Sequence, residues 1–68
     1  MTYYGFKNED TYGAAIIVDN DEYLHELASI WHTTVEQLAA ATRPHLPGWV
    51  DRRRVDWQGL LDRAQSPD

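Results

Sequence analysis

The chain has 68 residues, a net charge of −5 and no cysteine. A chain this short buries only about 60% of the surface that its unfolded form exposes, which predicts one small domain over residues 1–68 and leaves no room for a deep catalytic cleft. The lack of cysteine excludes disulfides and thiolate sites, and the longest apolar run, AAIIV, is far shorter than the roughly 20 residues of a membrane span, so we expect a soluble protein of the cytoplasm.

The first predicted element is a helix over residues 9–19. Asn8 is a good N-cap, and Glu9 and Asp10 fall in the first turn, where the positive end of the helix dipole stabilises carboxylates. The β-branched residues of AIIV favour a strand instead, so the pattern alone leaves residues 14–18 open between helix and strand. We interpret them as helix because the upstream residues fit a helix start.

Two further helices are predicted in the middle of the chain. Asp21 is the expected N-cap of a helix that stops near His32, because apolar residues recur there at three- and four-residue spacing. Thr33 and Glu36 fit a capping box, in which the threonine accepts a hydrogen bond from an amide and the glutamate reaches back to the cap. The helix that this box begins is expected to end at about Thr42, just before a proline.

The C-terminal part is predicted to be a connector followed by one more helix. RPHLPGW contains two prolines and a glycine, so it forms a link with a turn, and residues 50–54 are ambiguous. Asp56 is a plausible N-cap for a helix from Trp57 to Ala64, and residues 65–68 are expected to be frayed. The prediction is an all-α domain of three or four short helices. Its expected core consists of Tyr12, Ile16, Leu24, Leu27, Trp31, Leu38, Leu46, Trp57 and Leu61.

Charge is distributed unevenly along the chain. Residues 8–42 contain seven carboxylates and no lysine or arginine, whereas all six cations and the other four carboxylates lie outside this range. The carboxylates of this segment would repel phosphates, which argues against direct binding of nucleic acid by this part of the chain. A solvated acidic face that only keeps the protein soluble is the competing explanation.

The run YYGFKNEDTYGAAIIVDNDE and the later VDWQGLLDRA carry a family resemblance. They resemble the start (YxGYxNYETWNVALWIDNDE) and the end (VDWxELA) of a family of small phage, plasmid and bacterial proteins of unknown function. Together the two segments cover 30 of the 68 positions. Tyr12 and Ile17 stand where this family usually has tryptophan. The resemblance implies an origin in a mobile element and no catalytic or ligand residue.

Residues 16–46 also resemble a LysM module, a small βααβ glycan binder that occurs in phage tail proteins too. This resemblance would turn residues 15–18 into a strand, and it implies glycan binding or a phage structural role. LysM modules usually end with a proline-glycine-glutamine turn and a short strand, whereas VDWQGLLDRA lacks that proline and is typical of a helix. A LysM-like fold is therefore the alternative to the all-α domain.

The two central helices also have the proportions of a helix-turn-helix. The recognition helix, TVEQLAAAT, would then contain a glutamate, no cation and one candidate for reading bases, Gln37. The arginine run 52–54 could contact phosphates, but arginines beside Asp51 and Asp56 more often form surface ion pairs. A DNA-binding regulator stays an alternative, as does a generic accessory protein.

No catalytic or cofactor site is predicted. The sequence has no nucleophile with an adjacent base, no glycine-rich phosphate loop and no carboxylate pair in an evident cleft. His25, His32 and His45 lack the spacing of a zinc site. We therefore expect no enzyme activity, no metal and no cofactor.

Together these patterns predict a protein-binding inhibitor of a host defence system that handles nucleic acid, such as an anti-CRISPR or anti-restriction protein that acts as a DNA mimic. Its carboxylates would occupy a basic groove of a nuclease or CRISPR effector subunit, without membrane contact, and the protein would be a monomer or a weak homodimer. The expected contacts are six acidic residues and three aromatic anchors. They are Glu9, Asp10, Asp19, Asp21, Glu22, Glu26, Tyr3, Tyr4 and Trp49.

Overall fold

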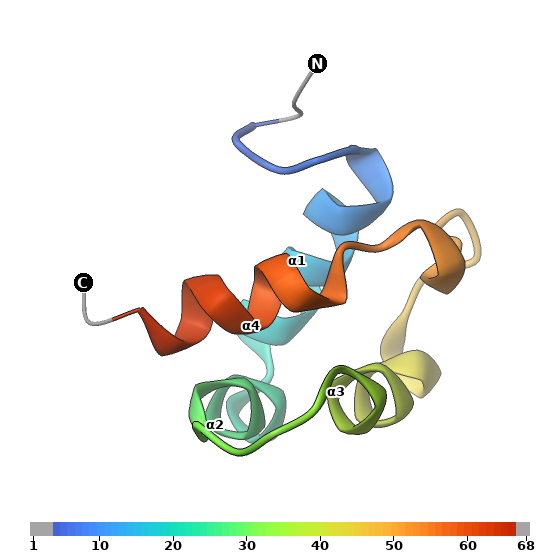
Figure 1. The fold of residues 1–68 in the computed structure, drawn as a ribbon. Helices are drawn as coiled ribbons and strands as arrows, with labels where there is room; N and C mark the ends of the chain where they lie inside the picture. The colour runs from blue at the N-terminus through green and yellow to red at the C-terminus, as the bar shows by residue number, and fades with distance from the viewer. Residues whose placement is uncertain (1–3, 67–68) are drawn as a thin grey trace.

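In the computed structural model, which describes residues 4–66, the chain folds into four α-helices (Figure 1). They are α1 (Glu9–Asn20), α2 (Glu22–Ser29), α3 (Val35–Thr42) and α4 (Trp57–Gln65), with two 3-10 turns, η1 (Arg43–His45) and η2 (Arg52–Arg54). The AIIV segment lies within α1, and no β-strand occurs within residues 4–66. The all-α prediction is confirmed, and the LysM-like βααβ alternative is wrong.

The helices pack as two crossing pairs. α2 and α3 lie side by side, and α1 and α4 lie across them (Figure 1). α4 contacts both α2 and α3, although α4 and α2 are far apart along the chain. On α2 and on α3, the side that is turned away from α1 and α4 is therefore left uncovered.

Side-chain caps fix the start of three helices. The predicted caps Asn8, Asp21 and Asp56 each accept a hydrogen bond from the backbone amide three residues on, at 2.8, 3.0 and 3.1 Å. Gly59 makes the last of these caps feasible, because a Cβ at this position would collide with the Asp56 carboxylate. These caps explain why the predicted starts of α1, α2 and α4 are confirmed.

The capping box of α3 is shifted by one residue from the prediction. Thr34 is the N-cap, and Gln37, not Glu36, reaches back to the backbone amide of the cap at 2.9 Å. Thr33 is unavailable because it is buried and donates its hydroxyl to the carbonyl of Leu27 at 2.7 Å. Glu36 is left exposed on the outer side of α3.

α2 is shorter than predicted and ends at Ser29 instead of near His32. The carbonyl of Leu27 accepts hydrogen bonds from the amide of Ile30 and from the Thr33 hydroxyl, so the chain leaves the helix at this point. Trp31, expected in the core, lies in the loop before α3 and is 83% exposed. This core assignment was wrong.

α1 turns its small residues inward. Its buried positions are Thr11, Gly13, Ala14, Ala15 and Val18. Ile16 points the other way and is 41% exposed, so its predicted place in the core was also wrong. The burial of the alanines and the valine keeps the segment helical despite its β-branched residues, since tertiary packing outweighs intrinsic propensity.

The remaining predicted core residues are buried or partly buried. Leu24, Leu38 and Leu61 are buried, and Tyr12, Leu27, Leu46 and Trp57 are partly buried. Four branched residues that the prediction missed complete the core, two of them from the connector. They are Val18, Val50, Val55 and Leu60.

The end of α4 is held more firmly than predicted. Gln65 belongs to the helix, and its Nε2 donates to the carbonyl oxygens of Ala28 at 3.3 Å and Ile30 at 2.8 Å. The predicted fraying therefore does not include residue 65. Residues 67–68 lie outside the described part of the chain.

A small hydrogen-bond network ties the start of α1 to the start of α4. The buried Thr11 hydroxyl donates to Asn8 Oδ1 at 2.8 Å and accepts from the amide of Asp56 at 2.9 Å. Asn8 Nδ2 donates in turn to the carbonyl of Arg54 at 2.9 Å. We refer to Asn8, Thr11, Arg54 and Asp56 as the α1 clamp.

Two buried threonines allow a matched stability test. Thr11 is part of the α1 clamp, whereas the Thr42 hydroxyl is buried with no hydrogen-bond partner among the described residues. Thr42→Val should raise the free energy of unfolding by about 1 kcal/mol, and Thr11→Val should lower it by about 1–3 kcal/mol because it leaves the part-buried amide of Asp56 unpaired. Urea unfolding followed by circular dichroism measures both. Equal destabilisation by the two substitutions would contradict this assignment.

Candidate protein-interaction surface

Three of the six predicted acidic contact residues have structural roles. Asp10 accepts a hydrogen bond from the amide of Asp51 at 2.9 Å and lies 3.6 Å from the Arg54 guanidinium. Asp19 pairs with Arg63 at 2.9 Å. Asp21 caps α2. These side chains are already engaged within the domain, so they do not form a free acidic surface.

The other three, Glu9, Glu22 and Glu26, are exposed and make no ion pair within residues 4–66. Glu9 begins α1, at the opposite end of that helix from α2. Glu22 and Glu26 are four residues apart on α2, so they lie on the same side of the helix. The acidic surface predicted from the sequence is thus reduced to this pair.

The predicted aromatic anchors differ in what the structure shows of them. Tyr3 lies outside the described residues. Tyr4 is 77% exposed, but its ring stacks on Tyr12 with centroids 5.1 Å apart. Trp49 is 56% exposed, yet a Cβ placed on Gly13 would lie 2.5 Å from the tip of its ring. Trp49 therefore packs on α1 and covers the one position there that has no side chain.

A more continuous apolar surface lies on α2. Tyr23 is 64% exposed, and it lines a hollow of about 370 Å³ together with Leu27, Ile30 and Glu26. A second hollow of about 530 Å³ starts from the same apolar side chains and extends to the alanines of α3. We refer to Glu22, Tyr23, Glu26, Leu27, Ile30 and Trp31 as the α2 face.

Sequence reasoning missed this surface although one signal was present. The apolar residues from Tyr23 to Trp31 form an arc that is wider than a core-facing stripe of a short helix requires. The core takes Leu24 and Ala28, and the rest of the arc stays exposed. The excess width of this apolar arc is the sequence signal that was not used to predict a second contact surface.

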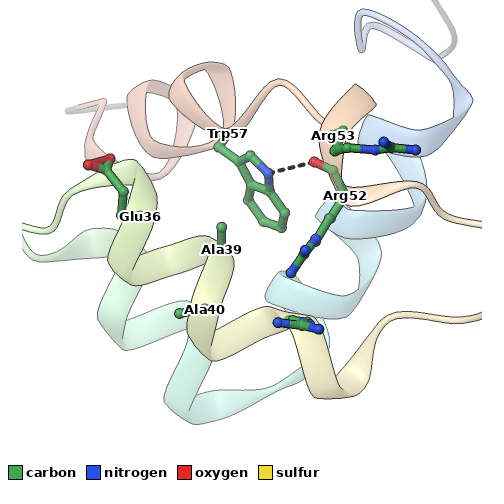
Figure 2. A pocket seen from close by; sticks show the side chains of 7 residues that line it. Glu36, Ala39, Ala40, Arg52, Arg53 and Trp57 are labelled. Carbon is green, nitrogen blue, oxygen red and sulfur yellow. Dashed lines mark hydrogen bonds between the residues drawn. The ribbon is translucent and has the colours of Figure 1, made fainter.

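A different kind of hollow, of about 380 Å³, lies between α3, η2 and the start of α4 (Figure 2). Ala39 and Ala40 line it, and Ala39 points towards the indole of Trp57, whose Nε1 donates to the Arg52 carbonyl at 2.9 Å. The Arg52 side chain extends into this space in Figure 2, and Arg43 also lines it. Neither arginine makes an ion pair in the part of the chain that the structure describes.

The other two arginines of the run form the predicted kind of ion pair. Arg53 lies 3.3 Å from Asp51, and Arg54 lies 3.6 Å from Asp10. The hydrogen bond from the Arg53 side chain holds the pKa of Asp51 below its ordinary value, with a further contribution from the Arg53 backbone amide. The expected pair with Asp56 is absent from the described residues, because that carboxylate caps α4.

Other kinds of site find little support in the described residues. Among residues 4–66, no three histidine or acidic side chains gather in a way that would hold a metal ion, and no helix is long and apolar enough to cross a membrane. No protein-family model matches the sequence, and no curated protein or solved structure matches it either. The geometry of the chain is therefore the basis for its proposed function.

Two tryptophans allow a test of the α2 face. Trp31→Ala should change the free energy of unfolding by no more than about 0.5 kcal/mol, since the side chain is almost fully exposed. Trp57→Ala should cost about 1–3 kcal/mol, because it removes a half-buried ring and its hydrogen bond to Arg52. Chemical unfolding of both variants measures the difference. A loss as large for Trp31 as for Trp57 would place Trp31 in the core.

Proposed function

We propose that this chain is a protein-binding module that docks through the α2 face. The observation that carries the proposal is the exposed Tyr23, which shares a hollow with Leu27, Ile30 and Glu26, while the exposed Trp31 directly follows Ile30 in the chain. Glu22 and Glu26 make no ion pair in the described chain. Exposed aromatic residues are the side chains that most often dominate the energy of protein interfaces. A contiguous exposed apolar surface with a polar rim is a common mark of an interaction site.

The chemistry of the α2 face defines the partner. The aromatic and aliphatic side chains fit an apolar pocket, and the paired glutamates favour lysines or arginines beside that pocket. The charges raise the association rate and are screened by salt, while the burial of the apolar side chains slows dissociation. The expected partner is therefore a protein with an apolar pocket that has a basic rim.

Inhibition of a host defence system is the specific form of this proposal. The resemblance of both ends of the chain to mobile-element proteins supports an anti-CRISPR or anti-restriction role in the host cytoplasm. The engagement of Asp10 and Asp19 by arginines leaves two neighbouring carboxylates rather than a phosphate-like row. This favours local recognition of a nuclease or effector subunit over mimicry of a DNA backbone.

A DNA-binding regulator is the second candidate, and one observation favours it. Arg43 and Arg52 lie beside α3 without ion-pair partners in the described chain, where a recognition helix would need phosphate contacts. Glu36 lines the same hollow, and the net charge of −5 opposes approach to DNA. Salt-dependent retardation of duplex DNA, lost in Arg52→Ala, would favour this candidate over protein binding.

The docking proposal predicts that Glu22→Lys/Glu26→Lys and Trp31→Ala each weaken partner binding by about tenfold or more, through lost steering and a lost anchor. The matched control is Glu9→Lys/Asp62→Lys, which changes the net charge equally and also reverses one first-turn glutamate. Affinity capture from host lysate at low and high salt identifies the partner. The affinity of each variant for the purified partner is the decisive measurement.

Phage plating in hosts with restriction or CRISPR immunity tests the specific form. Expression of the protein should raise the plating efficiency of targeted phage, and the α2 variants should lose this effect while the control keeps it. Partner binding through the α2 face without any protection would contradict the anti-defence role and leave the binding module intact. Binding that only Trp31→Ala weakens would point to an accessory protein that docks by apolar contacts alone.

A further inference from the structure

The side of α3 that borders the Trp57 hollow carries opposite charges at its two ends. Glu36 lies in the first turn and Arg43 directly follows the last residue, and both are exposed without an ion pair in residues 4–66. Ala39 and Ala40 lie between them, and all four side chains border one hollow. We refer to these four residues as the α3 ridge.

The Glu36 carboxylate is unpaired for a structural reason. Gln37 takes the capping role that the sequence pattern assigns to Glu36, so that carboxylate makes no bond to the start of its own helix. Elsewhere in the domain, Asp10 and Asp19 have arginine partners. The α3 ridge thus combines an unpaired anion and an unpaired cation on one short helix.

We propose that two copies of this chain form a symmetric dimer in which the α3 ridges pack antiparallel. Glu36 lies three residues before Ala39, and Arg43 lies three residues after Ala40. A two-fold axis that passes between the alanines places Glu36 of each copy opposite Arg43 of the other, as an isologous interface requires. Parallel packing would bring like charges together, so the charge pattern selects the antiparallel orientation.

The side chains at the centre of the α3 ridge allow close contact. Helices pack with axes about 8–10 Å apart, and alanines at the crossing permit the short end of this range. The hollow beside the ridge adds contact area, because the Trp57 indole forms its far wall (Figure 2). Arg52 extends into the same hollow.

The dimer does not rest on the proposed function. It would place two α2 faces on one assembly, and two linked sites bind a bivalent partner more tightly than one. A partner that binds the α2 face of a monomer remains compatible with it.

Reciprocal charge reversal tests the dimer. Sedimentation of the wild-type protein at low ionic strength should show an average mass that rises towards that of a dimer between about 10 μM and 1 mM. Glu36→Arg and Arg43→Glu should each weaken dimerisation by about tenfold or more, because each creates two like-charge contacts. The double variant Glu36→Arg/Arg43→Glu should restore it to within about threefold of wild type. Glu26→Arg, an equal charge change on α2, is the control and should dimerise as wild type.

Three outcomes would overturn the dimer or its geometry. The first is a monomer at every concentration, and the second is a dimer that the single reversals leave unchanged. The third is a double variant that stays monomeric while its circular dichroism and unfolding match wild type.

Disulfide cross-linking gives a second measurement that does not depend on charge. Because the chain has no cysteine, Ala40→Cys introduces a single thiol next to the proposed axis. A disulfide requires Cα atoms within about 7 Å, so this variant should form a covalent dimer under mild oxidation at least about tenfold faster than Gln58→Cys on α4. Equal rates for the two variants would contradict the antiparallel α3 interface.

Discussion

The hydrogen bonds of the α1 clamp hold together parts of the chain that are more than 40 residues apart. The Thr11 hydroxyl satisfies the amide of Asp56, and Asn8 both caps α1 and binds the Arg54 carbonyl. A part-buried polar network of this kind is most stabilising when each group has a partner. It fixes where α4 begins, and α4 in turn places the Trp57 indole beside α3, where its Nε1 donates to the Arg52 carbonyl. The arrangement of the hollow beside α3 depends on this connection.

The fold gives a structural explanation for the uneven charge distribution of the sequence. Asp10 and Asp19 belong to the cation-free segment, and arginines from the C-terminal part of the chain pair with both. The segregated charges therefore meet inside one domain and bring the two ends of the sequence together. Such partly exposed pairs contribute little stability individually, but they favour the native pairing of α1 with α4 over other arrangements. An acidic segment thus does not in itself indicate an acidic binding surface.

Local signals predicted the helices well because they depend on neighbouring residues. A polar cap such as Asn8 or Asp56 acts on amides three residues away, so the sequence is sufficient to place a helix start. Exposure is different, because it depends on which face of a helix meets the rest of the chain. Ile16 and Trp31 are apolar residues at helical spacing, yet both face solvent. The α2 face was missed for the same reason, since periodicity does not show how much of an apolar arc the core will cover.

The buried hydroxyl of Thr33 affects both exposed surfaces. Thr33 donates to the carbonyl of Leu27, and this bond accompanies the early end of α2 that leaves Trp31 in the loop. The same burial moves the cap of α3 to Thr34 and releases Glu36 to the α3 ridge. The helix start that the sequence pattern favours has Thr33 as the N-cap. It would require the Thr33 hydroxyl to give up its hydrogen bond to the Leu27 carbonyl. An unpaired buried polar group costs about 1–3 kcal/mol, so the hydrogen bond to Leu27 keeps the loop in the observed register. Trp31 of the α2 face and Glu36 of the α3 ridge therefore both stay exposed.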